Sequence, residues 1–196
     1  MIDRHRFFTS VRHTLFGADN TLTQDQVNGC NTLLDEFERR YPKGDYKKLS
    51  YYLATAYWET NQTMQPVREA YYISNNFETA EAWRKAHLWY YPWYGRGYVQ
   101  LTLETNYIRE SQADRTGVDL HANKELALDS KHAANIMFVG MEHGDYGGGP
   151  MSGYFSDTVE RPKDARHLVN GTDHAAEIAD IYWKFKAAIV DELPSS

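Results

Sequence analysis

The sequence predicts a mainly α-helical fold with at most a small β-hairpin. Apolar residues recur at helical spacing in several segments, whereas no segment shows a persuasive alternation of apolar and polar residues. Of the 196 residues, 42% are hydrophobic, which is enough to bury a core without a metal or a disulfide. We therefore expect one domain over residues 1–196, with N-terminal helices (1–45) packed onto a core (46–193).

Two helices are predicted in the N-terminal segment. The first covers residues 3–16, because its apolar residues are four apart, and Gly17 is its expected end. The second follows a capping box in which Thr23 precedes Gln26 by three residues. Its apolar stripe consists of Val27, Cys30, Leu34, Phe37 and Tyr41.

A third helix is predicted from Tyr46 to about Asn61. Its apolar face consists of Leu49, Tyr52, Leu53 and Ala56. Glu59 lies three residues after Ala56 and seven after Tyr52, so it projects beside the buried stripe. This position predicts a partly desolvated carboxyl group.

The rest of the chain predicts shorter helices separated by turns. They are expected over residues 78–88, over 102–113, from a cap at Asp129 to Gly144, and after a cap at Thr172 or Asp173. The segment 64–97 is irregular, because it holds two prolines, two glycines and many aromatic rings.

Charge and composition argue against several classes of function. The net charge is −6 and the basic residues are scattered, so we expect no nucleic-acid partner. No apolar stretch of signal-peptide length follows Met1, and no run is long enough to span a bilayer. The expectation is a monomer with no stable membrane insertion and no export signal of its own.

The reactive side chains predict neither a metal site nor a cofactor. Cys30 is the only cysteine and lies on an apolar helical stripe, so it is expected to be a buried, inert thiol. The histidines lack a matching set of metal ligands, and no glycine-rich loop of the phosphate-binding type is present.

Glu59 and Glu69 are the candidate acid/base pair. Glycoside hydrolysis uses one protonated carboxyl for the leaving oxygen and one carboxylate that activates water or attacks. Glu69 lies beyond the helix break at Pro66, so it could face Glu59 across a cleft. Glu78 and Glu81 remain alternatives for the second role, and each glutamate could instead be an ordinary surface residue.

A glycine-rich block lies downstream of this pair. Gly95 and Gly97 flank Arg96 and would let the backbone turn sharply. The turn would present Gln100 and Thr102 along one edge, and such uncharged polar groups suit sugar hydroxyls or a catalytic water. A tight structural turn without a binding role is the alternative.

Aromatic rings cluster between the candidate acid and the glycine block. They are Tyr71, Tyr72, Trp83, Trp89, Tyr90, Tyr91, Trp93, Tyr94 and Tyr98. Such rings either stack on sugars or pack in a core. If they line a groove, at least two of Tyr71, Tyr72, Trp89, Trp93 and Tyr98 should be partly exposed beside Glu59.

Several blocks of the sequence resemble the endolysins of phages and prophages that are related to family 19 chitinases. The blocks are residues 58–60, 64–70, 90–102, 106–107, 140–141, 154–155 and 165–171, within about 52–189.

This chain departs from the family's sequence pattern at two positions. The family usually has a histidine before the catalytic glutamate, where this chain has Trp58. In plant chitinases the second glutamate lies further downstream, nearer the spacing of Glu81, whereas phage-type sequences place an Arg-Glu-Ala segment where Glu69 lies.

The resemblance implies a lysozyme-like fold with a cleft between two lobes, and inverting hydrolysis without a cofactor. Glu59 would be the general acid and Glu69 the second carboxylate, with Thr102 a candidate to hold the attacking water. The predicted substrate-binding residues are Arg68, Tyr71, Tyr94, Arg96, Gln100, Asn106 and Asn170.

These expectations describe a peptidoglycan hydrolase that cuts the β-1,4 links of bacterial cell-wall glycan. It would be made in the cytoplasm of a host bacterium and would act at the wall, with a holin-type membrane lesion as one route of access. A chitinase, a lytic transglycosylase and a non-catalytic wall-binding or inhibitor protein on the same scaffold remain alternatives.

Overall fold

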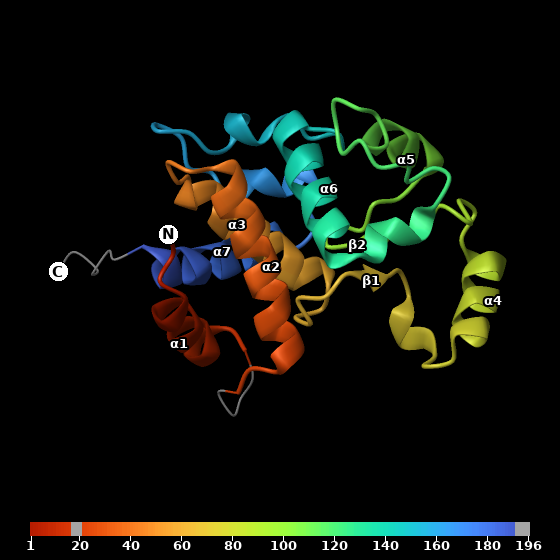
Figure 1. Cartoon of the computed structure of the whole chain (residues 1–196), viewed down its shortest axis with the longest axis horizontal. Coiled ribbons are helices and arrows are strands. Elements are labelled where there is room, and N and C mark those ends of the chain that lie inside the picture. Colours follow the sequence, from red (N-terminus) through yellow and green to blue (C-terminus); the bar gives the residue numbers. More distant parts are fainter. Residues whose placement is uncertain (17–20, 191–196) are drawn as a thin grey trace.

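The computed structural model describes residues 1–16 and 21–190 of the chain. In these ranges the protein is mainly helical with one small antiparallel sheet, which confirms the predicted fold class (Figure 1). The helices are α1 (Arg4–Thr14), α2 (Gln24–Arg40), α3 (Tyr46–Glu59), α4 (Phe77–His87), α5 (Glu104–Glu110), α6 (Ser130–His143) and α7 (Ala175–Ile189). The strands are β1 (Val67–Arg68) and β2 (Arg96–Gly97), and 3₁₀ helices are η1 (Tyr71–Ile73), η2 (Lys124–Leu128), η3 (Met151–Gly153) and η4 (Asp164–Leu168).

The helix ends follow local capping rules at most positions. The capping box of Thr23 and Gln26 is present at α2, and Asp129 caps α6. The predicted cap of the last helix is wrong: α7 starts after His174, which is left-handed (φ 55°) and makes no side-chain cap. The predicted helix end at Gly17 and the core boundary at 193 lie outside the described residues.

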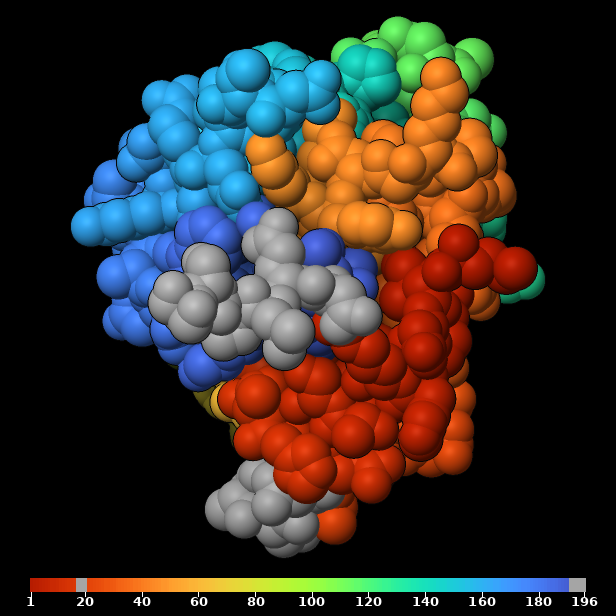
Figure 2. Space-filling model, turned by 90° about the vertical axis from the view of Figure 1, so that its left-hand side faces the viewer, coloured from red at the N-terminus to blue at the C-terminus, as the bar shows by residue number. Residues whose placement is uncertain are grey.

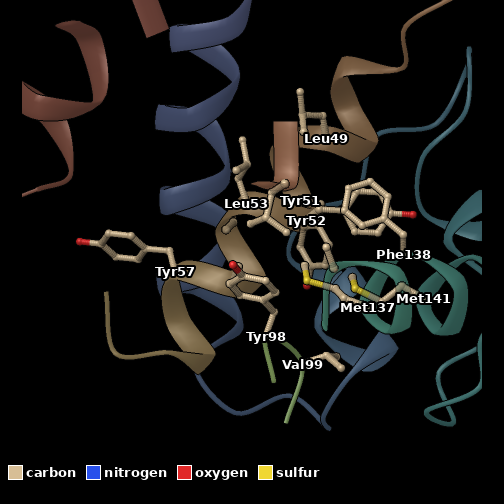
Figure 3. Packing of buried hydrophobic residues seen from close by; sticks show 14 of the residues in the cluster. Leu49, Tyr51, Tyr52, Leu53, Tyr57, Tyr98, Val99, Met137, Phe138 and Met141 are labelled. Carbon is tan, nitrogen blue, oxygen red and sulfur yellow. The ribbon is translucent and has the colours of Figure 1, made fainter. Parts of the chain in front are cut away.

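The central helix is α3, which packs against α2 and α7. All residues from Leu49 to Tyr57 are buried. The ring of Tyr52 stacks on that of Phe138 in α6, with centroids 3.9 Å apart (Figure 3). This burial holds α3 rigidly and so determines where its last residue, Glu59, lies.

The N-terminal helices pack onto this core. Helix α1 lies against α7, and α2 lies against α3 and α6. In the space-filling view the N-terminal segment (red) lies directly against the C-terminal part of the chain (blue) (Figure 2). None of the helices in the described part of the chain combines the length and the apolar character needed to cross a bilayer.

The chain turns sharply after Glu59. Asn61, Gln62 and Met64 have left-handed φ angles of 48°, 68° and 54°, which are costly for residues with side chains. Gly29 of α2 packs against this turn, and a Cβ atom there would lie 1.7 Å from the carbonyl oxygen of Met64. That close approach explains a glycine inside an amphipathic helix, and it directs the chain from Glu59 toward β1.

The sheet consists of β1 and β2, with Val67 paired to Gly97 and Arg68 paired to Arg96. The strands are not joined by a tight turn, because η1 and α4 lie in the connection between them. Helix α4 therefore lies at the end of the molecule opposite α1 (Figure 1). The sheet ties this outer segment to the rest of the fold.

Candidate functional site

Glu59 is held at the end of α3 by an arginine that sequence reasoning missed. The Nη1 group of Arg166 donates a hydrogen bond to Oε1 of Glu59 at 2.6 Å. The Arg166 side chain is 4% exposed and that of Glu59 is 16% exposed. Nε of Arg166 donates to the carbonyl oxygen of Asp173 at 3.0 Å. The buried guanidinium thus fixes one oxygen of the carboxyl group in place.

The sequence did carry a signal for Arg166. It lies in η4, inside the block 165–171 that contributes to the endolysin resemblance, but only the fold brings η4 to the end of α3. Trp58, the residue before Glu59, packs its ring against His174 with centroids 4.8 Å apart. A histidine is therefore present near this position, although it comes from a distant part of the chain.

Glu69 follows β1 and is anchored by four hydrogen bonds, one of which Nε of Arg84 donates to its carbonyl oxygen at 2.7 Å. Its Oε1 accepts from the hydroxyl of Tyr90 at 2.6 Å, and its Oε2 accepts from the backbone N–H of Gly95 at 2.8 Å. Its own N–H donates to the carbonyl of Gly95 at 2.7 Å. Burial, together with the Glu69 carboxylate, raises the pKa of Tyr90 to about 12, so its hydroxyl remains a donor at neutral pH.

The alternative glutamates are placed differently. Glu78 lies exposed in the first turn of α4. Oε2 of Glu81 accepts from Nη1 of Arg84 at 3.0 Å and from the hydroxyl of Tyr94 at 2.9 Å. Both of those donors belong to buried side chains, so Glu81 has a structural role in holding α4 against the β2 segment.

The structure brings Gln100, Thr102 and Asn106 together through a chain of hydrogen bonds. Nε2 of Gln100, a residue with φ 54°, donates to the carbonyl oxygens of Val67 and Gly97 at 3.0 and 3.1 Å. The Thr102 hydroxyl donates to the Gln100 carbonyl at 2.7 Å, and Nδ2 of Asn106 donates to the Thr102 carbonyl at 2.8 Å. All three side chains are half-buried, so they form one partly accessible polar edge.

The predicted substrate contacts of Tyr94 and Arg96 need correction, because both residues are buried, at 1% and 3% exposure. The Arg96 guanidinium lies 3.7 Å from the centroid of the Tyr94 ring. Its Nη1 donates to the carbonyls of Pro92 and Tyr94 and to the Tyr107 hydroxyl. A buried cation must have such partners, so these two side chains hold the glycine turn from within.

The remaining predicted binding residues are divided between two places. Arg68 and Tyr71 line a pocket beside β1. Asn170 is exposed and accepts a hydrogen bond from the N–H of Gly171 at 2.9 Å. Its own N–H donates to the Arg166 carbonyl at 3.0 Å, so it lies one turn beyond the residue that holds Glu59.

The rings are mixed in their exposure. Tyr72 is 76% exposed and Trp89 is 86% exposed, whereas Tyr98 is fully buried in the core. Tyr71 and Trp93 are half-buried. The expected exposure of at least two rings is confirmed, and their place beside Glu59 stays a prediction.

A buried carboxyl group lies one turn beyond Asn106 on α5. Glu110 is fully buried, and neither of its carboxyl oxygens has a hydrogen-bond partner among the described residues. Burial and the nearby Asp145 raise its pKa to about 8, against opposing effects of Arg115, Tyr146 and Arg109. Gly140 of α6 makes room for this group, since a Cβ there would lie 2.7 Å from Oε1 of Glu110.

This group should make stability depend on pH. Between about 4.5 and 8 the folded state retains a proton on Glu110 that the unfolded chain has lost. The contribution of Glu110 is therefore complete below pH 4.5 and falls by about 1.4 kcal/mol per pH unit as the pH rises toward 8. We expect Glu110→Gln to remove this slope in denaturant unfolding at pH 5 to 8. The exposed Glu78→Gln is the control, and parallel slopes for Glu110→Gln and wild type would contradict the prediction.

Comparison with protein-family models, with curated proteins and with solved structures gave no significant match. The endolysin resemblance of the sequence blocks therefore remains a prediction. What the geometry provides is a half-buried carboxylate held by a buried arginine, a second carboxylate anchored by Tyr90 and Gly95, and a polar edge of three uncharged side chains.

Proposed function

We propose that this protein is a peptidoglycan hydrolase that cleaves β-1,4 glycosidic bonds of bacterial cell-wall glycan by inverting acid/base hydrolysis. The observation that carries the proposal is the Glu59–Arg166 pair. Among the described residues, Arg166 is the only hydrogen-bond partner of the Glu59 carboxyl, so Oε2 is left for a proton that can be transferred.

In this proposal Glu59 is the general acid. Its protonated Oε2 donates to the glycosidic oxygen as the bond to the anomeric carbon breaks. Arg166 stabilises the carboxylate that forms when the proton leaves, because its guanidinium is already in place on Oε1. The buried position of Arg166 strengthens this interaction relative to one in bulk water.

Glu69 is the proposed base. The hydroxyl of Tyr90 and the N–H of Gly95 each hold one of its carboxylate oxygens, and each oxygen retains a lone pair for a water molecule. Thr102 and Gln100 are proposed to position that water and the substrate. An inverting enzyme keeps its two carboxyl groups roughly 6.5–9.5 Å apart in the productive complex, and the product should first appear as the inverted anomer.

The proposed setting follows from the substrate. The protein would be made as a monomer in the cytoplasm of a host bacterium and would act on the wall, with a holin-type lesion or cell lysis as the route of access. It would need neither a metal nor a cofactor.

Digestion of purified peptidoglycan and of chitin, in separate reactions, tests this proposal. We expect new reducing ends in the peptidoglycan digest, identified by mass spectrometry, and NMR of the fresh product should show the inverted anomer. Anhydro-sugar ends would show a lytic transglycosylase, and cleavage of chitin alone would show a chitinase. Binding to either polymer without new ends would show a non-catalytic protein.

A further inference from the structure

A pocket of about 380 Å³ lies beside the proposed base, between β1 and the start of α4. Its wall includes Arg68 and Val67 from β1, Ser74 and Asn75 from the connection, and Phe77 and Arg84 from α4. Two of the residues that line it are arginines, and none is an aspartate or glutamate. In a chain whose net charge is −6, such a wall is unusual and suits an anionic ligand.

Two arginines share one carboxylate behind the pocket wall. Glu125 pairs with Arg68 and also accepts a hydrogen bond from Nε of Arg96 at 3.1 Å, so one carboxylate serves two guanidinium groups. Arg84 has its own partner in Glu81. Arg68 therefore shares its carboxylate partner with Arg96, and of Arg68, Arg96 and Glu125 only Arg68 lines the pocket.

Arg68 is also incompletely satisfied by the protein. Its Nε is buried and has no hydrogen-bond partner among the described residues, although Nη2 pairs with Glu125. The guanidinium lies 5.2 Å from the centroid of the Phe77 ring, and about a third of the side chain (32%) is exposed. A ligand can reach this exposed part of the side chain. Carboxylates match the geometry of the guanidinium fork.

The proposed function suggests where such a carboxylate comes from. In peptidoglycan, every second sugar carries a lactyl ether that bears a short peptide with free carboxylates, whereas chitin carries no such group. A stem of three residues reaches roughly 10 Å when extended. Arg68 directly precedes Glu69, so a stem that branches from a sugar bound at Glu69 starts close to the pocket.

We propose that this pocket binds a carboxylate of the peptide stem and that Arg68 recognises it, so that the enzyme distinguishes peptidoglycan from chitin. This inference rests on the proposed function. It assigns the pocket a role in substrate selection, separate from the acid and base.

Binding of muramyl dipeptide, with chitobiose as the sugar-only probe, tests the inference without any catalytic step. By NMR titration we expect muramyl dipeptide to bind at least roughly tenfold more tightly than chitobiose. Arg68→Gln should remove most of that difference. The exposed Lys85→Gln in α4, which deletes a charge outside the pocket wall, should retain it.

If Arg68→Gln does not fold, a second variant of the pocket wall can be used in the same binding titration. Asn75→Asp adds a negative charge to the pocket wall with almost no change in shape, and it leaves Arg68 with Glu125 intact. It should weaken binding of muramyl dipeptide relative to chitobiose, whereas Asn28→Asp on the exposed face of α2 should not.

Kinetics separate this inference from the proposed function. Arg68→Gln should raise KM for stem-bearing glycan about tenfold more than KM for glycan stripped of its stems. Equal effects on both glycans, or equal binding of the two small probes by the wild-type protein, would overturn the inference even if peptidoglycan is cleaved. If the protein binds muramyl dipeptide more tightly than chitobiose through Arg68 but cleaves neither glycan, the role of the pocket is supported and the proposed hydrolase function is refuted.

Discussion

Glu59→Gln is expected to reduce clearance of a peptidoglycan suspension by roughly 10²–10⁴-fold or more. The substitution keeps the shape of the side chain but removes the proton that the proposed acid transfers. In the wild-type protein Nη1 of Arg166 donates to Oε1 of Glu59 at 2.6 Å. The amide oxygen of the variant can still accept this hydrogen bond, so the protein should fold. The measurement is turbidity loss over time, with circular dichroism and thermal unfolding to verify the fold.

A matched control distinguishes this loss from a general effect of removing a carboxylate. Glu78→Gln lies on the exposed first turn of α4 and should clear the suspension at the wild-type rate. A folded Glu59→Gln protein with near-normal clearance would refute the acid role of Glu59, and the proposed hydrolysis mechanism with it.

Gly97→Val should lower the melting temperature by roughly 10 °C and abolish activity. Gly97 has φ +86°, a conformation that costs a β-branched residue about 1–3 kcal/mol. In addition, an added Cβ would lie 2.8 Å from the carbonyl oxygen of Ala127, and such overpacking costs about another 1–3 kcal/mol. For a chain of this size each kcal/mol lowers the melting temperature by about 2–4 °C.

Activity should fall along with stability, because Gly97 pairs with Val67 in the sheet and its carbonyl accepts from Gln100. Gly117→Val separates the two physical causes. Gly117 also has a left-handed φ of +67°, but nothing lies within 4 Å of an added Cβ, so only the backbone cost should appear. If Gly97→Val is as mild as Gly117→Val, the close packing of this turn on η2 is not important for the site.

Much of the fold could be predicted because its signals are local. The capping box at Thr23, the buried Cys30, Leu34 and Phe37 of the α2 stripe, and the cap at Asp129 appear where the sequence places them, whereas Val27 is only half-buried and Tyr41 lies just beyond the helix. The third helix was predicted to end near Asn61, and it ends at Glu59. These features depend on residues three or four apart on one helix, and that spacing is visible in a single sequence.

The site was predictable only in part. Glu69 was expected beyond the Pro66 break and lies there, but its anchors at Tyr90 and Gly95 are 21 and 26 residues away. The partner of Glu59 is 107 residues away, and no local pattern connects them. At the turn around Arg96 the prediction was wrong in the other direction. The motif predicted ligand contacts for Tyr94 and Arg96, but the fold buries both side chains.

The sequence by itself determined the helical class, the caps and the position of Glu59 at the end of a buried helix, because these depend on interactions within one turn of the chain. Only the tertiary structure decided that Arg166 holds Glu59, that Tyr94 and Arg96 face inward, and that Arg68 lines a pocket of its own. These features depend on which segments, distant in the sequence, come together around a side chain and exclude water from it. A guanidinium looks the same in the sequence whether it is buried against carbonyls or left open to a ligand.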